Sequence, residues 1–344
     1  MATLRDIARA ASVSVGTVSR VINNSPNVSP QKRDKVKRIM KELHYQPDFM
    51  AQNLSRKRRQ TGELGLIVTG IDNPANAEIV RGATAEAERH GYVTMLCTAW
   101  STKEIQNYLE VFIRRQVEGV AIASYMDRRT IHTVAKLHTQ GVPIAVCRDS
   151  AWPFDAAEVD FDGIATVDFE SVSSCEQAVS YLISLGHRRI AAITGNAELS
   201  EGDPRLLGYK QALQKADLAY NPKLLFSGGS DTIMTGVHSM REALATERTI
   251  TAVFAFNDLL AIGALHSLQE SGIRVPEEMS VIGFDNILMS GYLNPPLSTI
   301  NVPKYEMGQA LIRELVGAIQ ETALGHESVN TNFVVRQSTG FARS

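Results

Sequence analysis

The chain has 344 residues, of which 44% are apolar and 21% are charged, and its formal net charge is −2. A chain of this length is expected to form two or more domains. Its composition excludes a disordered, collagenous or coiled-coil protein. It contains no run of the roughly 18 uncharged apolar residues that a membrane span needs, and charges from Arg5 onward interrupt the N-terminus before a secretory signal could form. We therefore expect a cytoplasmic protein.

Charge is divided unevenly along the chain. Residues 1–60 contain 13 Lys and Arg against four Asp and Glu, a net charge of +9. The other residues contain 22 basic and 33 acidic side chains, a net charge of −11. A small basic head on a larger acidic body indicates a protein that holds nucleic acid at one end.

Residues 3–43 show the pattern of three short helices. Thr3 and Asp6 form a capping box at the start of the first helix, and Ser14 is a good N-cap for a second helix, at residues 15–23, after a turn at residues 12–13. Ser29 followed by Pro30 predicts the start of a third. The expected inward stripes are Leu4, Ile7, Ala8 and Ala11, then Val18, Val21 and Ile22, and finally Val36, Ile39, Met40 and Leu43.

The outward face of the second helix lacks bulky apolar side chains, because it carries Val15, Gly16, Ser19 and Arg20. Two short helices joined by a tight turn and supported by a third form a helix-turn-helix, whose second helix enters the major groove of DNA. Arg20 could contact guanine or phosphate there.

The segments TLRDIARAASVSVGTVSRVINN and VSPQKRDKVKRIMKELHYQPDFMAQNLSRK resemble the headpiece of the lactose repressor and galactose repressor family of bacterial transcription factors. The resemblance implies a DNA-binding domain at residues 1–46, a hinge helix and linker at 47–60, and an effector-binding and dimerisation domain at 61–344. It implies a hinge helix that forms on operator DNA, with Leu54 wedged into the minor groove, which suits a segment too short to be a stable helix in water. The expected DNA-binding residues are Ser14, Val15, Gly16, Thr17, Ser19, Arg20, Asn23, Ala51, Asn53, Leu54 and Arg56.

From Glu63 onward, strand-like runs alternate with amphipathic helices in two series, the second of which begins after residue 162. This pattern predicts an α/β body of two doubly wound parallel-sheet lobes, with ligands beyond the carboxyl ends of the strands. We expect an N-lobe at about 61–162 plus 292–325 and a C-lobe at about 163–291 plus 326–344. The predicted strands are 64–69, 93–98, 119–124 and 143–147, then 189–194, 252–256 and 280–284.

The loops of the body carry motifs that resemble the effector domain of the same family, which is similar to periplasmic sugar-binding proteins. The resemblance places an effector in a cleft between the lobes, contacted by Arg205, Asn257 and Asp285, while Asp258 is expected to cap the next helix. A carboxylate that accepts from two hydroxyls beside an arginine fork is chemistry that suits a polyol. The matching motifs are G-H-R-R-I (186–190), R-L-x-G-Y (205–209), F-N-D (256–258), V-I-G-F-D-N (281–286), P-P-L-S-T-I (295–300) and R-Q-S-T-G (336–340).

The chain departs from the family pattern in two places. Many relatives have an aromatic segment after the first strand, where this chain has Asn73-Pro74-Ala75-Asn76, so Asn76 would meet the effector in place of a ring. Relatives commonly have Asp directly after the fourth strand, where this chain has Arg148 and then Asp149. Either Arg148 faces the effector, which would favour a phosphate or carboxylate on the sugar, or Asp149 takes the role and Arg148 pairs with a neighbouring acid.

The interpretation is therefore a bacterial, nucleoid-associated transcriptional regulator, expected to be a repressor, that binds double-stranded operator DNA as a homodimer under control of a sugar-like effector. A sugar-binding protein without a DNA role is disfavoured by the basic headpiece. An enzyme is disfavoured because the chain has no dinucleotide-binding, phosphate-loop or nucleophile-elbow motif. We expect no cofactor and no metal, since the histidines lack ligand spacing and Cys97, Cys147 and Cys175 are widely separated.

Overall fold

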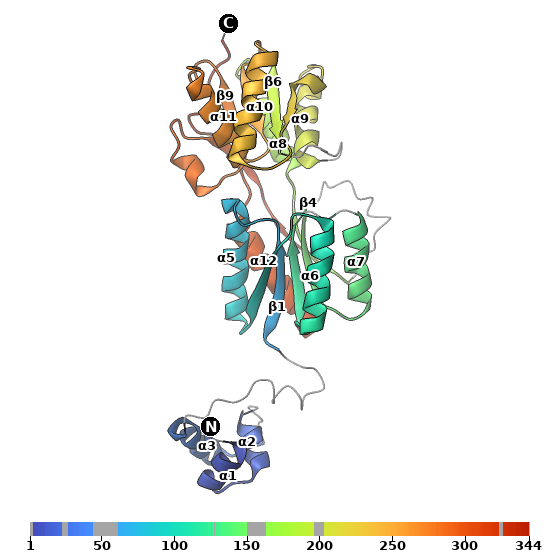
Figure 1. The fold of residues 1–344 in the computed structure, drawn as a ribbon, viewed down its shortest axis with the longest axis vertical. Coiled ribbons are helices and arrows are strands. Elements are labelled where there is room, and N and C mark those ends of the chain that lie inside the picture. Colours follow the sequence, from blue (N-terminus) through green and yellow to red (C-terminus); the bar gives the residue numbers. More distant parts are fainter. Residues whose placement is uncertain are drawn as a thin grey trace. The chain divides into compact units, whose positions relative to one another are not determined.

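The computed structural model describes residues 3–22, 27–43, 61–124, 126, 128–149, 163–195, 203–322 and 326–343. The chain divides into a headpiece, Met1–Thr61, and a body, Gly62–Ser344 (Figure 1). In the described part, no helix has the length and apolar character to cross a membrane.

The headpiece contains the three predicted helices, α1 (Leu4–Ala11), α2 (Val15–Ile22) and α3 (Pro30–Glu42). The capping box is present, because Thr3 Oγ1 accepts from the amide of Asp6 and the Asp6 carboxylate accepts from the amide of Thr3. Ser12 then takes a left-handed conformation, with φ 53°, and turns the chain into α2. The apolar stripes meet in a buried core of Ile7, Ala8, Ala11, Val18, Val21 and Val36.

Two details of the third helix differ from expectation. Ser29 occupies the N-cap position of α3, but its side chain makes no capping hydrogen bond. Leu43 was expected in the inward stripe and is exposed instead. The reason is that α3 ends at Glu42, so that Leu43 is the C-cap residue and lies beyond the helical spacing.

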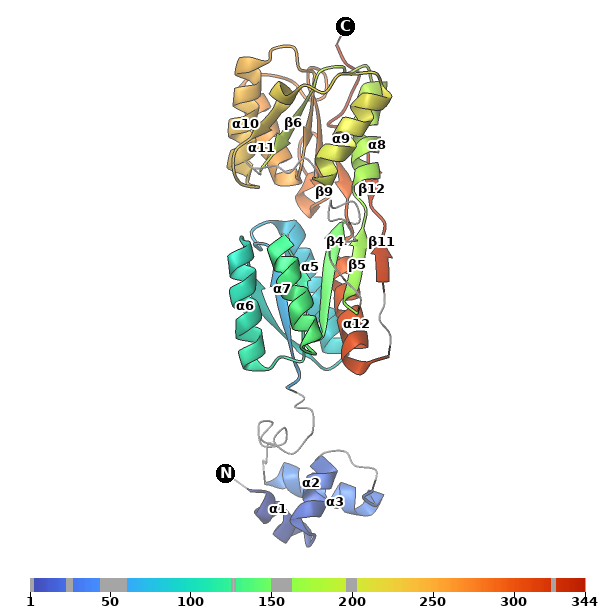
Figure 2. The same cartoon turned by 90° about the vertical axis from the view of Figure 1, so that its right-hand side faces the viewer.

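The N-lobe is built on a six-stranded sheet with the order β11-β5-β4-β3-β1-β2, in which every pairing is parallel. Helices α5 (Pro74–Arg89) and α12 (Lys304–Gln320) cover one face, and α6 (Thr102–Arg115) and α7 (Arg128–Thr139) cover the other (Figure 1, Figure 2). The strands are β1 (Glu63–Val68), β2 (Val93–Thr98), β3 (Gly119–Ala123), β4 (Ile144–Asp149), β5 (Ala165–Phe169) and β11 (His326–Val329).

The C-lobe repeats this plan, with the order β12-β10-β9-β8-β6-β7 and one antiparallel pairing, between β10 and β12. Helices α8 (Val172–Ser184) and α9 (Pro204–Lys215) cover one face, and α10 (Ile233–Thr246) and α11 (Asp258–Glu270) cover the other (Figure 2). The strands are β6 (Ile190–Thr194), β7 (Leu225–Ser227), β8 (Ala252–Ala255), β9 (Ser280–Asp285), β10 (Ser298–Asn301) and β12 (Asn332–Val334), with short 3-10 helices η1 (Pro222–Leu224) and η2 (Leu288–Gly291).

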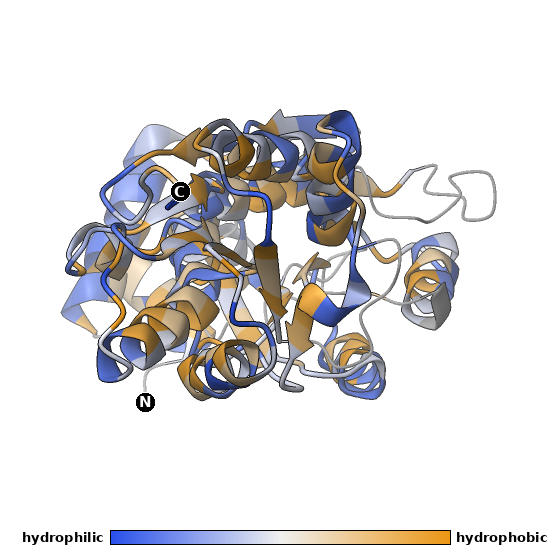
Figure 3. Cartoon of the chain, turned by 90° about the horizontal axis from the view of Figure 1, so that it is seen from above, coloured by the Kyte–Doolittle hydropathy of each residue, from blue (hydrophilic) through white to orange (hydrophobic). Residues whose placement is uncertain are grey.

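Burial of the strands on both faces accounts for their continuous apolar sequences. All residues of β3, β6, β8 and β9 are buried, and Figure 3 shows the strands coloured as hydrophobic between helices that carry both colours. Helices α5 and α12 pack so closely against each other that their contact requires glycine. A Cβ on Gly82 would lie 2.0 Å from the carbonyl oxygen of Tyr305.

The chain passes between the lobes three times: after β5, after β10, and between β11 and β12. Side-chain hydrogen bonds connect the crossover segments to each other and to β4. The Ser171 hydroxyl donates to the carboxylate of Asp149, at the end of β4, and Thr331 Oγ1 donates to the carbonyl of Glu170 at 2.6 Å. All crossovers thus lie at one edge of the two sheets.

These crossovers correct the predicted lobe boundaries, which were placed at 162/163, 291/292 and 325/326. Strands β5 and β11 belong to the N-lobe sheet and β10 belongs to the C-lobe sheet, so each crossing comes several residues later than expected. Each of these strands has four or five residues and includes polar side chains, so none has the apolar run that identified the others.

Candidate functional site

The outward face of α2 is exposed as the helix-turn-helix pattern predicts. Val18 and Val21 are buried against α1 and α3, which leaves Val15, Gly16 and Arg20 exposed. Within the described residues, Arg20 has no ion-pair partner. A helix that presents small side chains and one guanidinium can approach the floor of a DNA groove closely.

The start of α2 is fixed by two of the predicted DNA-binding residues. Ser14 Oγ accepts from the amide of Thr17 at 3.1 Å and lies 2.9 Å from Thr17 Oγ1. The cap therefore orients both hydroxyls at the end of the helix that would point toward DNA. The other predicted DNA contacts lie outside the described residues, namely Asn23, Ala51, Asn53, Leu54 and Arg56.

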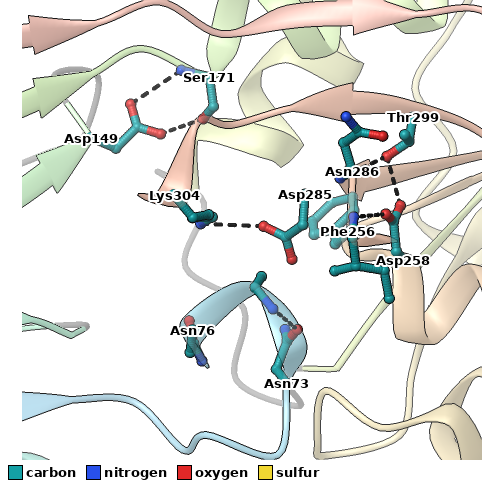
Figure 4. Close-up of polar contacts among 12 residues, drawn as sticks. Asn73, Asn76, Asp149, Ser171, Phe256, Asp258, Asp285, Asn286, Thr299 and Lys304 are labelled. Carbon is teal, nitrogen blue, oxygen red and sulfur yellow. Dashed lines mark hydrogen bonds and ion pairs between the residues drawn. The ribbon is translucent and has the colours of Figure 1, made fainter. Parts of the chain in front are cut away.

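The second candidate site lies where the carboxyl-end loops of the two lobes meet. At its centre is Asp285, the last residue of β9 (Figure 4). Asp285 and Asn286 have φ of 107° and 56°, a strained pair of consecutive left-handed residues of the kind that clusters at functional sites. These two conformations turn the chain sharply at the end of the buried strand. The Asp285 carboxylate extends from there toward the N-lobe (Figure 4).

The neighbouring Asn286 is held from several sides. Its Oδ1 accepts from Arg336 Nη2 at 2.6 Å, its Nδ2 donates to Asn301 Oδ1 at 3.0 Å, and its amide donates to Thr299 Oγ1 at 3.3 Å. Arg336 begins the R-Q-S-T-G motif near the C-terminus of the chain, so that motif supports the loop which carries Asp285.

Asp285 forms an ion pair with the N-lobe. Lys304 Nζ, from the first residue of α12, lies 3.2 Å from Asp285 Oδ1, and the ammonium also lies 5.8 Å from the ring centre of Phe169. Lys304 was not among the predicted site residues, because its partner is on the other lobe and no local pattern connects the two.

Arg205 is in the expected region, but its guanidinium is already occupied. Nε and Nη2 donate to the two carboxylate oxygens of Asp203 at 3.2 and 3.0 Å, and Nη1 donates to the carbonyl of Phe256 at 3.0 Å. The group also lies over the rings of Phe256 and Phe284, at 5.3 and 5.8 Å. Burial opposes the charge, but attraction to Asp203 outweighs it and raises the pKa of Arg205 above its ordinary value.

The cap of α11 is Asn257, and not Asp258 as had been expected. Asn257 caps α11, because its Oδ1 accepts from the amide of Leu260 at 2.8 Å. Asp258, the expected cap, is fully buried and accepts from the amide of Ile287 and from Thr299 Oγ1, at 2.9 and 2.6 Å. Burial raises the pKa of Asp258 to about 7 despite these bonds. The correction follows from geometry, since a residue just before the helix caps it and the next one turns to the sheet.

The N-lobe contributes the first turn of α5 to the meeting of the loops. Asn73 caps this helix, and Asn76 follows it in the first turn (Figure 4). Asn76 Nδ2 donates to the carbonyl of Gly70 at 2.9 Å. Ala75 packs against Leu259 and Ile287 of the C-lobe. The position where the family resemblance led us to expect a ring is thus a small interlobe contact in this chain.

The sheet register gives both residues at the end of β4 a partner within the protein. Arg148 lies opposite Asp168 on β5, and its fork donates to the two carboxylate oxygens of Asp168 at 2.7 and 2.8 Å. The hydrogen bond to Asp168 raises the pKa of Arg148. Arg148 therefore pairs with a neighbouring acid, while Asp149, on the other face of the strand, binds the first crossover through Ser171.

The charged side chains that act most strongly on Arg205 are carboxylates. Asp203, Asp231 and Asp285 all act electrostatically on its guanidinium. No cluster of His, Cys, Asp and Glu among the described side chains could hold a metal ion. The arrangement can bind hydroxyl groups by donation to Asp285 and acceptance from the cations.

Two family models match the chain. The model for bacterial regulatory proteins of the lacI family matches residues 3–48, and the model for a periplasmic binding protein-like domain matches residues 179–339. The first match covers the helix-turn-helix, and the second covers most of the C-lobe together with α12.

Similar proteins cover nearly the whole chain. The ribose operon repressor of Haemophilus influenzae is 36% identical over 93% of this chain and 92% of its own length. The structure of a CelR–cellobiose complex is 34% identical with a TM-score of 0.70, over 98% of this chain and 100% of the other. The lac repressor dimer bound to operator and an anti-inducer is 26% identical with a TM-score of 0.85, over 98% and 99% of the two chains. The chain belongs to the lacI family of bacterial regulatory proteins and is a DNA-binding transcriptional regulator.

Proposed function

We propose that the chain is a transcriptional repressor that reads an approximately palindromic operator as a homodimer and changes its DNA affinity when a neutral sugar binds between the lobes. The observation that carries the DNA-binding role is the exposed face of α2, on which Gly16 and Ser14 allow close approach and Arg20 is unpaired within the described residues. We infer that Arg20 donates to a guanine or phosphate, with Val15 in contact with a thymine methyl.

The DNA-binding role is tested by selecting a preferred duplex from random DNA with the full chain and then comparing variants on it. Arg20→Ala should weaken binding to the selected duplex about 5- to 150-fold, since a good bidentate pair contributes about 1–3 kcal/mol. Arg248→Ala is the matched control, because Arg248 is an exposed arginine of the C-lobe. Equal affinity of Arg20→Ala and Arg248→Ala for the selected duplex would remove Arg20 from the interface.

The effector is proposed to be a neutral polyhydroxylated molecule. Asp285 and Arg205 would contact it from the C-lobe and Asn76 from the N-lobe, with Asn257 close by as the cap of α11. The carboxylates around Arg205 disfavour an anionic ligand, and the charge of Arg148, which would favour one, is neutralised by Asp168. Two of the similar proteins carry a sugar in their names, the ribose operon repressor and the CelR–cellobiose complex.

The effector class is tested by thermal shift and calorimetry with D-ribose, cellobiose and ribose 5-phosphate. A neutral sugar at 100 times its dissociation constant should stabilise the protein by about 2.7 kcal/mol. Asp285→Asn should lose most of this gain, and asparagine tolerates the positive φ at this position. Preferential binding of ribose 5-phosphate would contradict the neutral-sugar proposal.

The proposed homodimer has apolar surface available on both lobes. Val93 and Leu96 are exposed on the edge strand β2, and Leu288 and Tyr292 are 80% and 82% exposed around η2. We infer that some of these exposed apolar side chains are covered in the dimer. Tyr292→Asp should shift the protein toward monomer in sedimentation, whereas an unchanged dimer would place the interface elsewhere.

The proposed action is binding without catalysis, and the named relatives are repressors. A cytoplasmic, nucleoid-associated location follows from the proposal, since the operator is there.

A further inference from the structure

We propose that Lys304 is an effector contact supplied by the N-lobe. In this proposal Lys304 and one effector hydroxyl both bind Asp285 of the C-lobe, so that effector binding depends on the spacing of the two lobes. This inference rests on the proposed neutral-sugar effector. It starts from the ion pair of 3.2 Å between Lys304 Nζ and Asp285 Oδ1 (Figure 4), which joins α12 of one lobe to β9 of the other.

The position of Lys304 in α12 is not explained by the helix. Lys304 is its first residue, where the helix dipole disfavours a cation, and the N-cap residue Pro303 makes no side-chain capping bond. The pair is also largely removed from water, because the side chains of Lys304 and Asp285 are 15% and 8% exposed. Attraction to Asp285 and to the face of Phe169 accounts for an ammonium at this place.

Both partners keep hydrogen-bonding capacity after they pair. A carboxylate has about four acceptor sites and an ammonium has three donors, and the ion pair uses one of each. A sugar hydroxyl at this point could donate to Asp285 while its oxygen accepts from Lys304. A carboxylate or phosphate on the ligand would meet the charge of Asp285, and an ammonium would meet that of Lys304, so the pair selects a neutral hydroxyl.

The location of Lys304 explains how the contact would depend on the angle between the lobes. Lys304 follows the crossover segment Val302–Pro303, which connects β10 of the C-lobe to α12 of the N-lobe. A change in the angle between the lobes would therefore alter the distance from Nζ to Asp285. An effector that bonds both groups binds better when the lobes hold them together, and this difference in affinity is what can shift the equilibrium between lobe positions.

The experiment uses calorimetry of the full chain with D-ribose and with cellobiose. Lys304→Met should bind the preferred sugar about 10- to 100-fold more weakly, as expected for loss of a hydrogen bond from a charged donor. Lys304→Arg, which keeps the charge, should recover part of the affinity. Lys215→Met is the control, because Lys215 forms a surface ion pair with Glu176 and its side chain is 65% exposed.

A second readout needs no ligand. The melting temperatures of Lys304→Met, Asp285→Asn and the double variant should be non-additive, with the double variant more stable than the sum of the two single effects predicts. Additive effects would overturn the interlobe bridge. The same melting curves show whether Lys304→Met folds, because a folded variant must unfold in a cooperative thermal transition.

The outcomes separate the two proposals. If Lys304→Met binds the sugar as tightly as Lys215→Met does while Asp285→Asn loses it, the inference about Lys304 is wrong and the effector site stands. If the wild type binds neither sugar, the neutral-sugar proposal fails, and the effector role of Lys304 is overturned with it. Weakened binding by Lys304→Met, with recovery by Lys304→Arg, supports the inference.

Discussion

Replacement of Arg205 by Met should destabilise the body through the carboxylate that it leaves behind. Arg205 makes two hydrogen bonds to Asp203 and one to the carbonyl of Phe256. Asp203 is only 4% exposed, and removal of one partner from a buried ion pair typically costs about 3–5 kcal/mol. The Arg205 side chain is 27% exposed, so water can reach the site, and we expect a loss near 3 kcal/mol.

The loss should depend on pH in a defined direction. In the wild type, burial would raise the pKa of Asp203, but the charge of Arg205 outweighs it and lowers that pKa below its ordinary value. The ionised carboxylate therefore contributes stability above its ordinary pKa, and this contribution disappears as pH falls through the lowered value. Without the charge and side-chain hydrogen bonds of Arg205, the pKa of Asp203 is higher in the variant than in the wild type, so the deficit of the variant shrinks as pH falls toward about 4.

The assay is urea unfolding of the full chain at neutral and acid pH, with Arg241→Met as the control. Arg241 forms an exposed ion pair with Glu270, for which we expect about 0–1 kcal/mol. Asp203→Asn in the Arg205→Met background should recover about half or more of the loss, since it removes the buried charge. A loss for Arg205→Met no larger than that for Arg241→Met would refute the reasoning.

Two further predictions rest on contacts in the structure, and a third tests the role that the family resemblance gives Leu54. His187 lies 2.8 Å from Thr251 Oγ1 and 3.0 Å from the carbonyl oxygen of Gly340, and burial lowers its pKa. His187→Ala should cost about 1–3 kcal/mol in thermal unfolding at pH 7.5. The wild type should lose stability as pH falls below about 6.5, because the unfolded chain takes up the proton first. Arg148→Ala should reduce stability and leave the calorimetric affinity for neutral sugars unchanged, whereas weaker sugar binding would return Arg148 to the site. Leu54→Ala should weaken binding to the selected duplex and spare random DNA in anisotropy titrations, and an unchanged ratio would exclude the minor-groove wedge.

Local signals were sufficient for the headpiece and for much of the body. The capping box at Thr3 and Asp6 and the stripe of α1 involve residues within one or two turns, so the sequence predicts them directly. Strands such as β3 and β6 are continuous apolar runs, which identify a parallel sheet buried on both faces. Strands β5 and β11 lack such runs, and the lobe boundaries were misplaced for that reason.

The chemistry of the effector site depends on pairings between distant residues. The ion pair of Arg148 depends on the sheet register that places it opposite Asp168, which the sequence does not state. Arg205 has its partner two residues away, and Asp203 followed by Pro204 is an N-cap pattern that could have been recognised. Lys304 could have been noticed as a cation in the first turn of a helix, where it is disfavoured, but its partner on β9 required the fold.

The central claim is that a sugar bound in the body controls how tightly the headpiece holds a specific DNA sequence. The direct measurement is an anisotropy titration of the full chain with the selected duplex and a scrambled duplex, at one salt concentration, with and without saturating sugar identified by calorimetry. We predict binding to the selected duplex about a thousandfold or more tighter than to the scrambled one, and a change of about fivefold or more on the selected duplex when sugar is added. Equal affinity for the two duplexes, or an affinity for the selected duplex that the sugar does not change, would contradict the account.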